Sequence, residues 1–175
     1  AMASLAAALA TGHESPLDFD LSALTRFKGV RRRQDVLHQS ERWIVIEDFA
    51  HHPTAIAAAI EALRAAYPDR QMMACFEPRS NTAATCRFQS EFQSALAGAD
   101  RVYFGKVHRA ERMRPEERLD TEAMARALHD AHAFDSNEQL LETLKANTKG
   151  KGGLVVFFTN GSFDGLPRKL ADSLN

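Results

Sequence analysis

The sequence predicts an α/β fold with a mainly parallel sheet of about six strands, an antiparallel hairpin at one edge, and helices on both faces. From residue 34 onward, short apolar runs alternate with longer segments of helical periodicity, the pattern of strands joined by crossover helices. Residues 154–158 are almost continuously apolar, as expected for a strand at the centre of a parallel sheet. The first two apolar runs are too close together for a crossover, so we expect them to pair as the hairpin.

The strands are expected in the short runs rich in branched and aromatic residues. They are placed at residues 34–38, 43–46, 71–76, 101–104, 131–134 and 154–158. Between them, apolar residues recur at every third or fourth position, which is typical of helices with one buried face. Helices are therefore placed at residues 53–67, 85–96, 121–129, 136–145 and 166–174.

Local signals support these helices. Pro53 is well placed in a first helical turn. Ser136, with Gln139 three residues later, predicts a capping box at the start of the fourth helix. The expected buried faces are marked by Ile56, Ile60, Leu63 and Tyr67 in the first helix, Phe88, Phe92 and Leu96 in the second, and Met124 and Leu128 in the third.

Residues 1–32 follow a different pattern and are expected to be a separate piece ahead of a domain at residues 33–175. Residues 1–10 are apolar, but they lack a basic leader and fall far short of the ~20 residues that a membrane span needs. We expect an amphipathic helix there and a second short helix at residues 21–27, with the basic run 31–33 marking the boundary. Because the chain begins inside a helical pattern, we expect it to be a fragment of a longer protein.

The composition excludes several classes of protein. Hydrophobic residues are 45% and charged residues 26% of the chain, which argues against disorder, collagen and a coiled-coil rod. The 22 basic and 23 acidic residues give no overall electrostatic reason to expect a nucleic acid or a membrane as partner. Cys75 and Cys86 are too few for a disulfide framework, and both lie beside apolar residues. We expect reduced thiols, at least half-buried, in a cytosolic protein.

Three polar loops follow buried strands and form the candidate site. They are residues 47–54, 77–82 and 159–165. Ligands of open parallel sheets bind beyond the carboxyl ends of the strands, and these ends lie at one edge. We therefore expect the three loops to open on the same edge.

In the first loop, Asp48 stands at a strand end, where a carboxylate is suited to accept both hydroxyls of a ribose. His51 and His52 could donate to a phosphate or another ligand oxygen. The alternative is that Asp48 caps the helix beginning at Pro53 and that the histidines are ordinary turn residues. A zinc site is disfavoured, because two adjacent histidines cannot easily bind one ion and no cysteine or third histidine lies at ligand spacing.

The other two loops offer groups for anions. Arg79 could grip a carboxylate or phosphate, and residues 80–82 add short donors, one of which could cap the next helix. Gly161 and Gly165 allow close approach of the backbone to an anion. The alternatives are a solvated turn, an ordinary glycine loop and, for the basic run 31–33, a solvated linker.

Several motifs are missing from the sequence. It contains no G-x-x-x-x-G-K-[ST] motif, so it has no triphosphate cradle of that type. It also lacks a G-x-S-x-G nucleophile elbow and a G-x-G-x-x-G motif after the first strand.

Four segments carry a resemblance to a known family. Residues 27–33 (FKGVRRR) and 47–54 (EDFAHHPT) resemble the passage into the C-terminal domain of the Mur ligases of bacterial cell-wall synthesis. Residues 76–82 (FEPRSNT) and 160–165 (NGSFDG) resemble the branch of that family that recycles murein tripeptides. The resemblance covers nearly the whole chain, with the segments in the family's order.

The resemblance implies a Rossmann-like C-terminal domain of an ATP-dependent carbon–nitrogen ligase. The whole enzyme would join L-Ala-γ-D-Glu-meso-diaminopimelate to UDP-N-acetylmuramate through an acyl phosphate, in the cytoplasm, during peptidoglycan recycling. ATP and Mg²⁺ would be held mainly by a central domain, of which residues 1–32 would be the end, and the UDP sugar by an N-terminal domain. The present domain would close over ATP, would be inactive alone, and would need no nucleic acid or membrane.

Matching positions imply two sets of contacts. The set for ATP is Arg32, Arg33, Asp48, Phe49 and His51. The set for the tripeptide is Arg79, Ser80, Asn81, Asn160 and Gly161. The resemblance assigns no catalytic residue and no metal ligand to this chain.

Three alternatives stay open. One is the branch of the same family that adds L-alanine to UDP-N-acetylmuramate, and another is a non-catalytic nucleotide-binding module. The third is a phospho-receiver domain, because Glu47 and Asp48 resemble its acidic pair. That domain also needs an Asp after the middle strand and a Lys after the last, where this chain has residues 77–78 (EP) and 159–160 (TN).

Overall fold

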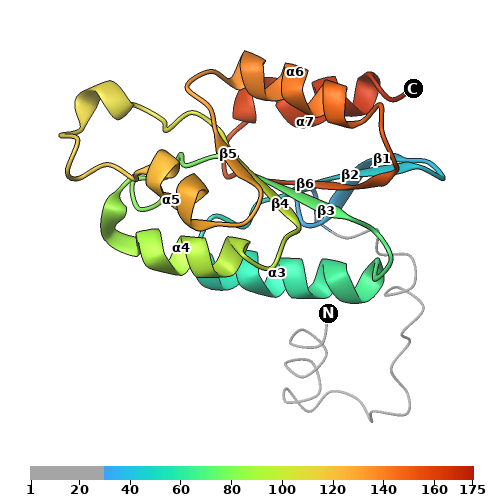
Figure 1. Cartoon of the computed structure of the whole chain (residues 1–175), viewed down its shortest axis with the longest axis horizontal. Helices are drawn as coiled ribbons and strands as arrows, with labels where there is room; N and C mark the ends of the chain where they lie inside the picture. Colours follow the sequence, from blue (N-terminus) through green and yellow to red (C-terminus); the bar gives the residue numbers. More distant parts are fainter. Residues whose placement is uncertain (1–29) are drawn as a thin grey trace, which may run out of the picture. The chain divides into compact units, whose positions relative to one another are not determined.

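The computed structural model describes residues 30–175, which form a six-stranded sheet with helices on both faces (Figure 1). The strands are β1 (Asp35–Gln39), β2 (Trp43–Asp48), β3 (Met72–Phe76), β4 (Arg101–Phe104), β5 (Ala131–Ala133) and β6 (Gly153–Phe158). Their order is β1-β2-β6-β3-β4-β5; β1 pairs antiparallel with β2, and every other pair is parallel. The predicted fold class, including the edge hairpin and the central apolar strand, is confirmed.

Two layers of helices cover the sheet. Helices α3 (Pro53–Ala66), α4 (Gln89–Leu96) and α5 (Thr121–Ala127) lie on one face, and α6 (Asn137–Asn147) and α7 (Leu166–Asp172) on the other (Figure 1). Successive side chains of a strand point to opposite faces, so β2 sends Ile44 and Ile46 into the first core and Trp43 and Val45 into the second. The strand ends between the two layers are therefore the part of the sheet left open to a ligand.

Some local predictions were wrong. The second predicted helix begins as a 3-10 turn, Cys86–Phe88, before α4. Ser136 is the N-cap of α6 but caps no backbone amide, because its hydroxyl donates to Glu138 Oε2 at 2.5 Å. Cys75 is buried as expected, and burial raises the pKa of its thiol, but Cys86 is exposed.

The two helices predicted at residues 1–10 and 21–27 lie outside the described residues. The compact unit that carries the sheet is Arg31–Asn175, and the boundary at residue 32 stays a prediction. Within residues 30–175, every helix is too short or too polar to cross a bilayer.

Candidate functional site

The three predicted loops lie side by side at the carboxyl edge of the sheet. Strand β6 lies between β2 and β3, and Phe158 at its end is level with Asp48 on one side and Phe76 on the other. Backbone hydrogen bonds extend past the strand ends: Thr159 N donates to Asp48 O at 3.0 Å, and Glu77 N donates to Phe158 O at 3.0 Å. The loops that follow β2, β3 and β6 therefore begin as one continuous surface.

Asp48 is buried and already bound to the backbone on both oxygens. Ala50 N donates to Oδ1 at 2.7 Å, and Gln34 N donates to Oδ2 at 3.0 Å. The alternative that Asp48 caps α3 is wrong, since the N-cap of that helix is His52, which makes no side-chain cap. Asp48 instead fixes the segment before β1 against the turn after β2. Its carboxylate oxygens each keep a further lone pair, so a hydroxyl could still be accepted.

Arg32 is held by groups of the chain itself. Its Nε donates to Glu47 Oε1 at 2.9 Å, and its Nη2 donates to Thr159 O at 3.0 Å and also to Gly161 O. The residue adopts a left-handed backbone with φ 60°, a conformation that costs free energy in a residue with a side chain. Arg32 thus ties the end of β2 to the loop after β6.

Arg33 has a different environment. It is exposed, and its guanidinium carbon lies 5.3 Å from the centre of the Phe49 ring, with that of Arg32 at 5.2 Å. Among residues 30–175, no carboxylate forms an ion pair with Arg33. This guanidinium is available to an anionic ligand that stacks or lies near Phe49.

The adjacent histidines point to different neighbours. The ring of His51 meets Phe49 edge-on at 5.2 Å, and its Nδ1 lies 2.9 Å from Phe49 O. The ring of His52 lies 5.4 Å from Phe88 instead. Arg33, Phe49 and His51 therefore form one cluster, from which His52 is separate. The described residues contain no group of three or more His, Cys, Asp or Glu placed to hold a metal ion.

Glu77 organises the second and third loops, and sequence reasoning gave it no role. It is 3% exposed, and its Oε2 accepts hydrogen bonds from Phe163 N at 3.2 Å and from the Thr159 hydroxyl. Its Oε1 lies 3.5 Å from Arg79 Nη1. The only signal in the sequence is an acidic residue placed directly after a fully apolar strand, where burial of its charge requires partners.

Gly161 lies between two arginines. A Cβ at this position would come within 2.1 Å of Arg79 Cδ and 2.4 Å of Arg79 Nε, so the side chain of Arg79 rests on the Gly161 backbone. The Gly161 carbonyl accepts from Arg32, and its amide donates to Thr159 Oγ1 at 2.9 Å. We call Arg32, Gly161 and Arg79 the glycine clamp. The clamp connects the residues predicted to contact ATP with those predicted to contact the tripeptide, because Arg32 and Arg79 both contact Gly161.

The remaining residues predicted to contact the tripeptide differ in whether their side chains already form hydrogen bonds within the chain. Ser80 Oγ accepts from Ala83 N at 3.0 Å and so caps a turn ahead of the 3-10 segment. Asn81 is exposed. Asn160 is half-buried, and its buried Oδ1 has no hydrogen-bond donor among residues 30–175, so a ligand amide or ammonium at this point would satisfy it.

Asn137, at the start of α6, was also missed. It is 6% exposed; its Oδ1 accepts from Lys106 N at 3.0 Å and its Nδ2 donates to Asp164 Oδ2 at 2.7 Å. Asn137 therefore connects the loop after β4 with the loop after β6. Sequence spacing gave no sign of this, because the three groups come from separate parts of the chain.

A cavity of about 510 Å³ lies beside the clamp. Its lining includes the cationic residues Arg31, Arg32 and Arg168 and the acidic residues Asp35 and Glu47. Together with exposed Arg33, this edge presents several cations, an aromatic ring and the amide side chains of Asn81 and Asn160. That set can hold a nucleotide or another polyanion next to a second, amide-bearing or carboxylate-bearing substrate.

Comparison with known proteins decides the family. The model of the family described as "Mur ligase, glutamate ligase domain" matches residues 32–161. The chain belongs to the Mur ligase family. Membership decides against the phospho-receiver alternative. The chain is 33% identical to the UDP-N-acetylmuramate–L-alanine ligase of Chlorobium phaeobacteroides, over 95% of this chain and 37% of that protein.

Two solved Mur ligase structures are also similar. One is a domain from a proposed UDP-N-acetylmuramate:L-alanyl-γ-D-glutamyl-meso-diaminopimelate ligase of Haemophilus ducreyi, with 27% identity and a TM-score of 0.63 over 82% of this chain and 100% of that one. The other is a murein peptide ligase of Psychrobacter arcticus, with 25% identity and a TM-score of 0.70 over 98% of this chain and 35% of that one. The MurF ligase of Thermotoga maritima, solved with ADP, shares the fold at 19% identity, with a TM-score of 0.66 over 99% of this chain and 38% of that one.

Proposed function

We propose that the chain is the C-terminal domain of a cytoplasmic, ATP-dependent Mur ligase that joins an amino substrate to UDP-N-acetylmuramate during peptidoglycan synthesis or recycling. The chain spans 37% of the length of its curated relative, so the remaining parts of the reaction are assigned to other domains. Those domains would hold most of the ATP, its Mg²⁺ and the UDP sugar. ATP phosphorylates the muramate carboxylate, and the amine then attacks the acyl phosphate and releases inorganic phosphate.

The observation that carries the proposal is the glycine clamp. Arg32 holds the Gly161 carbonyl and Arg79 lies on the same glycine, so the nucleotide side and the amino-substrate side meet at one residue. An acyl phosphate and an amine must be brought within bonding distance and shielded from water. A domain that carries both subsites on one rigid sheet edge meets this need when it closes.

The nucleotide side is assigned to Arg33, Phe49, His51 and Asp48. Arg33 is the preferred phosphate contact, because its guanidinium is exposed and unpaired within residues 30–175, whereas that of Arg32 is bound to Glu47 and two carbonyls. Arg32 then acts as a positioning residue. Phe49 and His51 line the nucleotide, and Asp48 accepts a ribose hydroxyl in addition to its two backbone amides.

The amino-substrate side is assigned to Arg79, Ser80, Asn81, Asn160 and Gly161. L-alanine is the first candidate substrate, since the curated relative with 33% identity is an L-alanine ligase. The tripeptide L-Ala-γ-D-Glu-meso-diaminopimelate is the second candidate. Two solved relatives support this candidate, since one is described as a ligase of this tripeptide and the other as a murein peptide ligase. The guanidinium group of Arg79 also suits the additional carboxylates of a tripeptide, because it can bind a carboxylate through two hydrogen bonds.

The deciding experiment measures ATP hydrolysis and amide formation by the full-length protein with UDP-N-acetylmuramate and either amino substrate. Arg79→Ala should raise the KM for the tripeptide about tenfold or more, since a charge-assisted contact is lost. Arg87→Ala, at an exposed arginine stacked on Phe88, is the matched control. Amide formation with neither substrate would contradict the proposal.

A second test addresses the division of labour between domains. In isothermal titration the 175-residue chain should bind ATP weakly at most and should hydrolyse none. In the full-length protein, Asp48→Ala should weaken ATP binding. Unchanged ATP affinity in that variant would overturn the assignment of Asp48 to the nucleotide side.

A further inference from the structure

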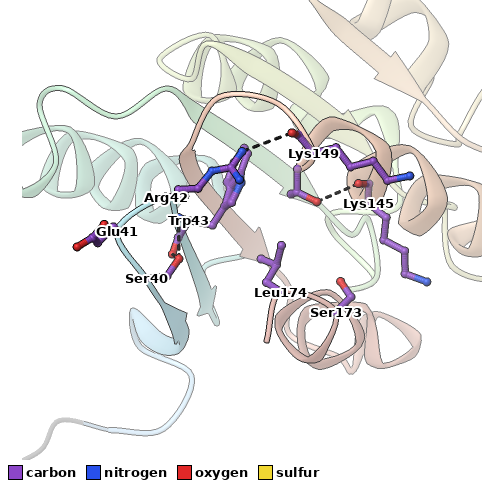
Figure 2. Close-up of a pocket in the computed structure, with 9 residues that line it drawn as sticks. Ser40, Glu41, Arg42, Trp43, Lys145, Lys149, Ser173 and Leu174 are labelled. Carbon is purple, nitrogen blue, oxygen red and sulfur yellow. Dashed lines mark hydrogen bonds between the residues drawn. The ribbon is translucent and has the colours of Figure 1, made fainter.

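A second pocket lies at the opposite edge of the sheet from the glycine clamp. It has a volume of about 650 Å³ and is formed where β2 and β6 begin, between the β1–β2 turn and the C-terminal ends of α6 and α7 (Figure 2). Its lining residues are Ser40, Glu41, Arg42, Trp43, Lys145, Thr148, Lys149, Ser173 and Leu174. Five steps along β2 at about 3.3 Å each separate Trp43 from Asp48, so the two ends are ~16 Å apart.

The walls of this pocket are held in place by internal hydrogen bonds. Ser40 Oγ accepts from Trp43 N at 3.0 Å, and Thr148 Oγ1 donates to Lys145 O at 3.0 Å. Arg42 Nη2 donates to Gly150 O at 2.5 Å, which fixes the loop between α6 and β6 against the hairpin. These groups are engaged with one another, so the pocket exists before a ligand arrives, as is usual for small-molecule sites.

The charges at its mouth favour an anion. Arg42, Lys145 and Lys149 contribute cationic side chains, against the single carboxylate of Glu41. In Figure 2 the Glu41 side chain is directed away from Lys145, which lies in α6, and from Lys149, which lies in the turn after α6. Lys145 Nζ is paired with Glu142 Oε1 at 2.9 Å, but within residues 30–175 no carboxylate pairs with Lys149. Lys149 is therefore the cation most available to a ligand.

The floor of the pocket is apolar. Trp43 and Leu174 are the apolar side chains of its lining. Trp43 is 4% exposed and belongs to the core that α6 and α7 cover, so it is a fixed part of the floor. An apolar floor below a cationic mouth is complementary to a molecule with an apolar body and an anionic head group.

We propose that this pocket binds a small organic anion, such as an aryl phosphate or aryl carboxylate, separately from the site at the glycine clamp. The apolar body lies on Trp43 and Leu174, and the anionic group pairs with Lys149, with Lys145 and Arg42 adding to the positive potential. Neither part of such a ligand is sufficient alone, since an exposed ion pair contributes little without burial of apolar surface.

Nuclear magnetic resonance of the chain tests this directly, because Trp43 is the single tryptophan among 175 residues and gives one indole N–H signal. The probe is phenyl phosphate, compared with phenol and inorganic phosphate. Phenyl phosphate should shift the indole signal saturably, with a dissociation constant about tenfold or more below those of phenol and inorganic phosphate. Equal affinity for phenyl phosphate and inorganic phosphate, or an unmoved indole signal, would overturn the proposal.

A pair of variants locates the anionic group. Lys149→Glu should weaken phenyl phosphate binding roughly tenfold, since it replaces attraction by repulsion at the mouth. Lys151→Glu makes the same charge change at an exposed lysine outside the lining and should leave the affinity unaltered. Well-dispersed amide spectra establish that both variants are folded. Equal weakening in both, or shifts confined to residues 48–51 and 160–162, would place the anion elsewhere and refute the assignment.

Discussion

Two regions on the carboxyl edge of the sheet carry arginines and carboxylates but differ in burial. At the end of β2 and directly after β3, the carboxylates of Asp48 and Glu77 are 5% and 3% exposed and bind backbone amides. In the loop after β4, Arg114 pairs with Glu117, and their side chains are 69% and 49% exposed. Water can replace the exposed pair but not the buried contacts. Burial of the charged groups, more than polar composition, thus distinguishes a preorganised binding site from a solvated loop.

The largest effect is expected at Glu77. Glu77→Ala leaves the Phe163 amide, the Thr159 hydroxyl and Arg79 without their common acceptor, and should lower the free energy of unfolding by about 3 kcal/mol. Urea denaturation of the chain measures this. Glu117→Ala is the matched control and should leave the urea midpoint unchanged. If the two variants unfold at the same urea concentration, the contrast between the regions is wrong.

Asp48 offers a gentler test of the buried region. In Asp48→Asn, the side-chain NH2 group faces one of two backbone amides, Gln34 or Ala50, and the clash should cost roughly 1–2 kcal/mol. Hydrogen exchange of these two amides should become faster. Asp69→Asn, at an exposed aspartate, is the control. Unchanged exchange at both amides would mean that Asp48 does not hold the segment before β1.

The sequence predicted the fold better than the contacts within the site. Strand positions follow from apolar runs, and the shared edge of three loops follows from parallel topology. The partners of Glu77 do not follow, because Thr159 is 82 residues away and the contact depends on the order β2-β6-β3. Arg32 was predicted as a ligand contact for the same reason, since nothing local shows that its guanidinium is bound by the chain. The capping box failed because Glu138 competes for the Ser136 hydroxyl.

A substitution in the glycine clamp should affect ligand binding more than stability. In Gly161→Ala the new Cβ would overlap Arg79 Cδ, and the Arg79 side chain, 34% exposed, can move outward. The free energy of unfolding should therefore fall by about 1 kcal/mol or less. The full-length ligase should nevertheless lose affinity for its amino substrate about tenfold, read as a higher KM.

Gly150→Ala is the control for the clamp, since its Cβ would meet only Asn147 O at 3.3 Å. It should change neither the KM nor the urea midpoint appreciably. A Gly161→Ala protein with normal KM would show that Arg79 does not need its place on this glycine.

The smallest effect is expected in the exposed loop. The side-chain hydrogen bond from Arg114 holds the pKa of Glu117 below its ordinary value. A carboxylate with a lowered pKa adds stability above its ordinary pKa and loses it as the pH falls through the folded value. Because solvent and salt screen this exposed pair, the contribution should be too small to shift the urea midpoint.

Arg114→Ala should therefore return the pKa of Glu117 to its ordinary value in a carboxyl NMR titration. The difference in urea midpoint between this variant and the parent chain should stay close to zero from about pH 3 to 7, a range that spans the ordinary Glu pKa of ~4.3. The two measurements report different quantities. The pKa of Glu117 reports its local interaction with Arg114, whereas the urea midpoint reports how much that interaction contributes to the stability of the chain after screening. A loss of stability in Arg114→Ala comparable with that in Glu77→Ala would show that exposure is not what distinguishes the two regions.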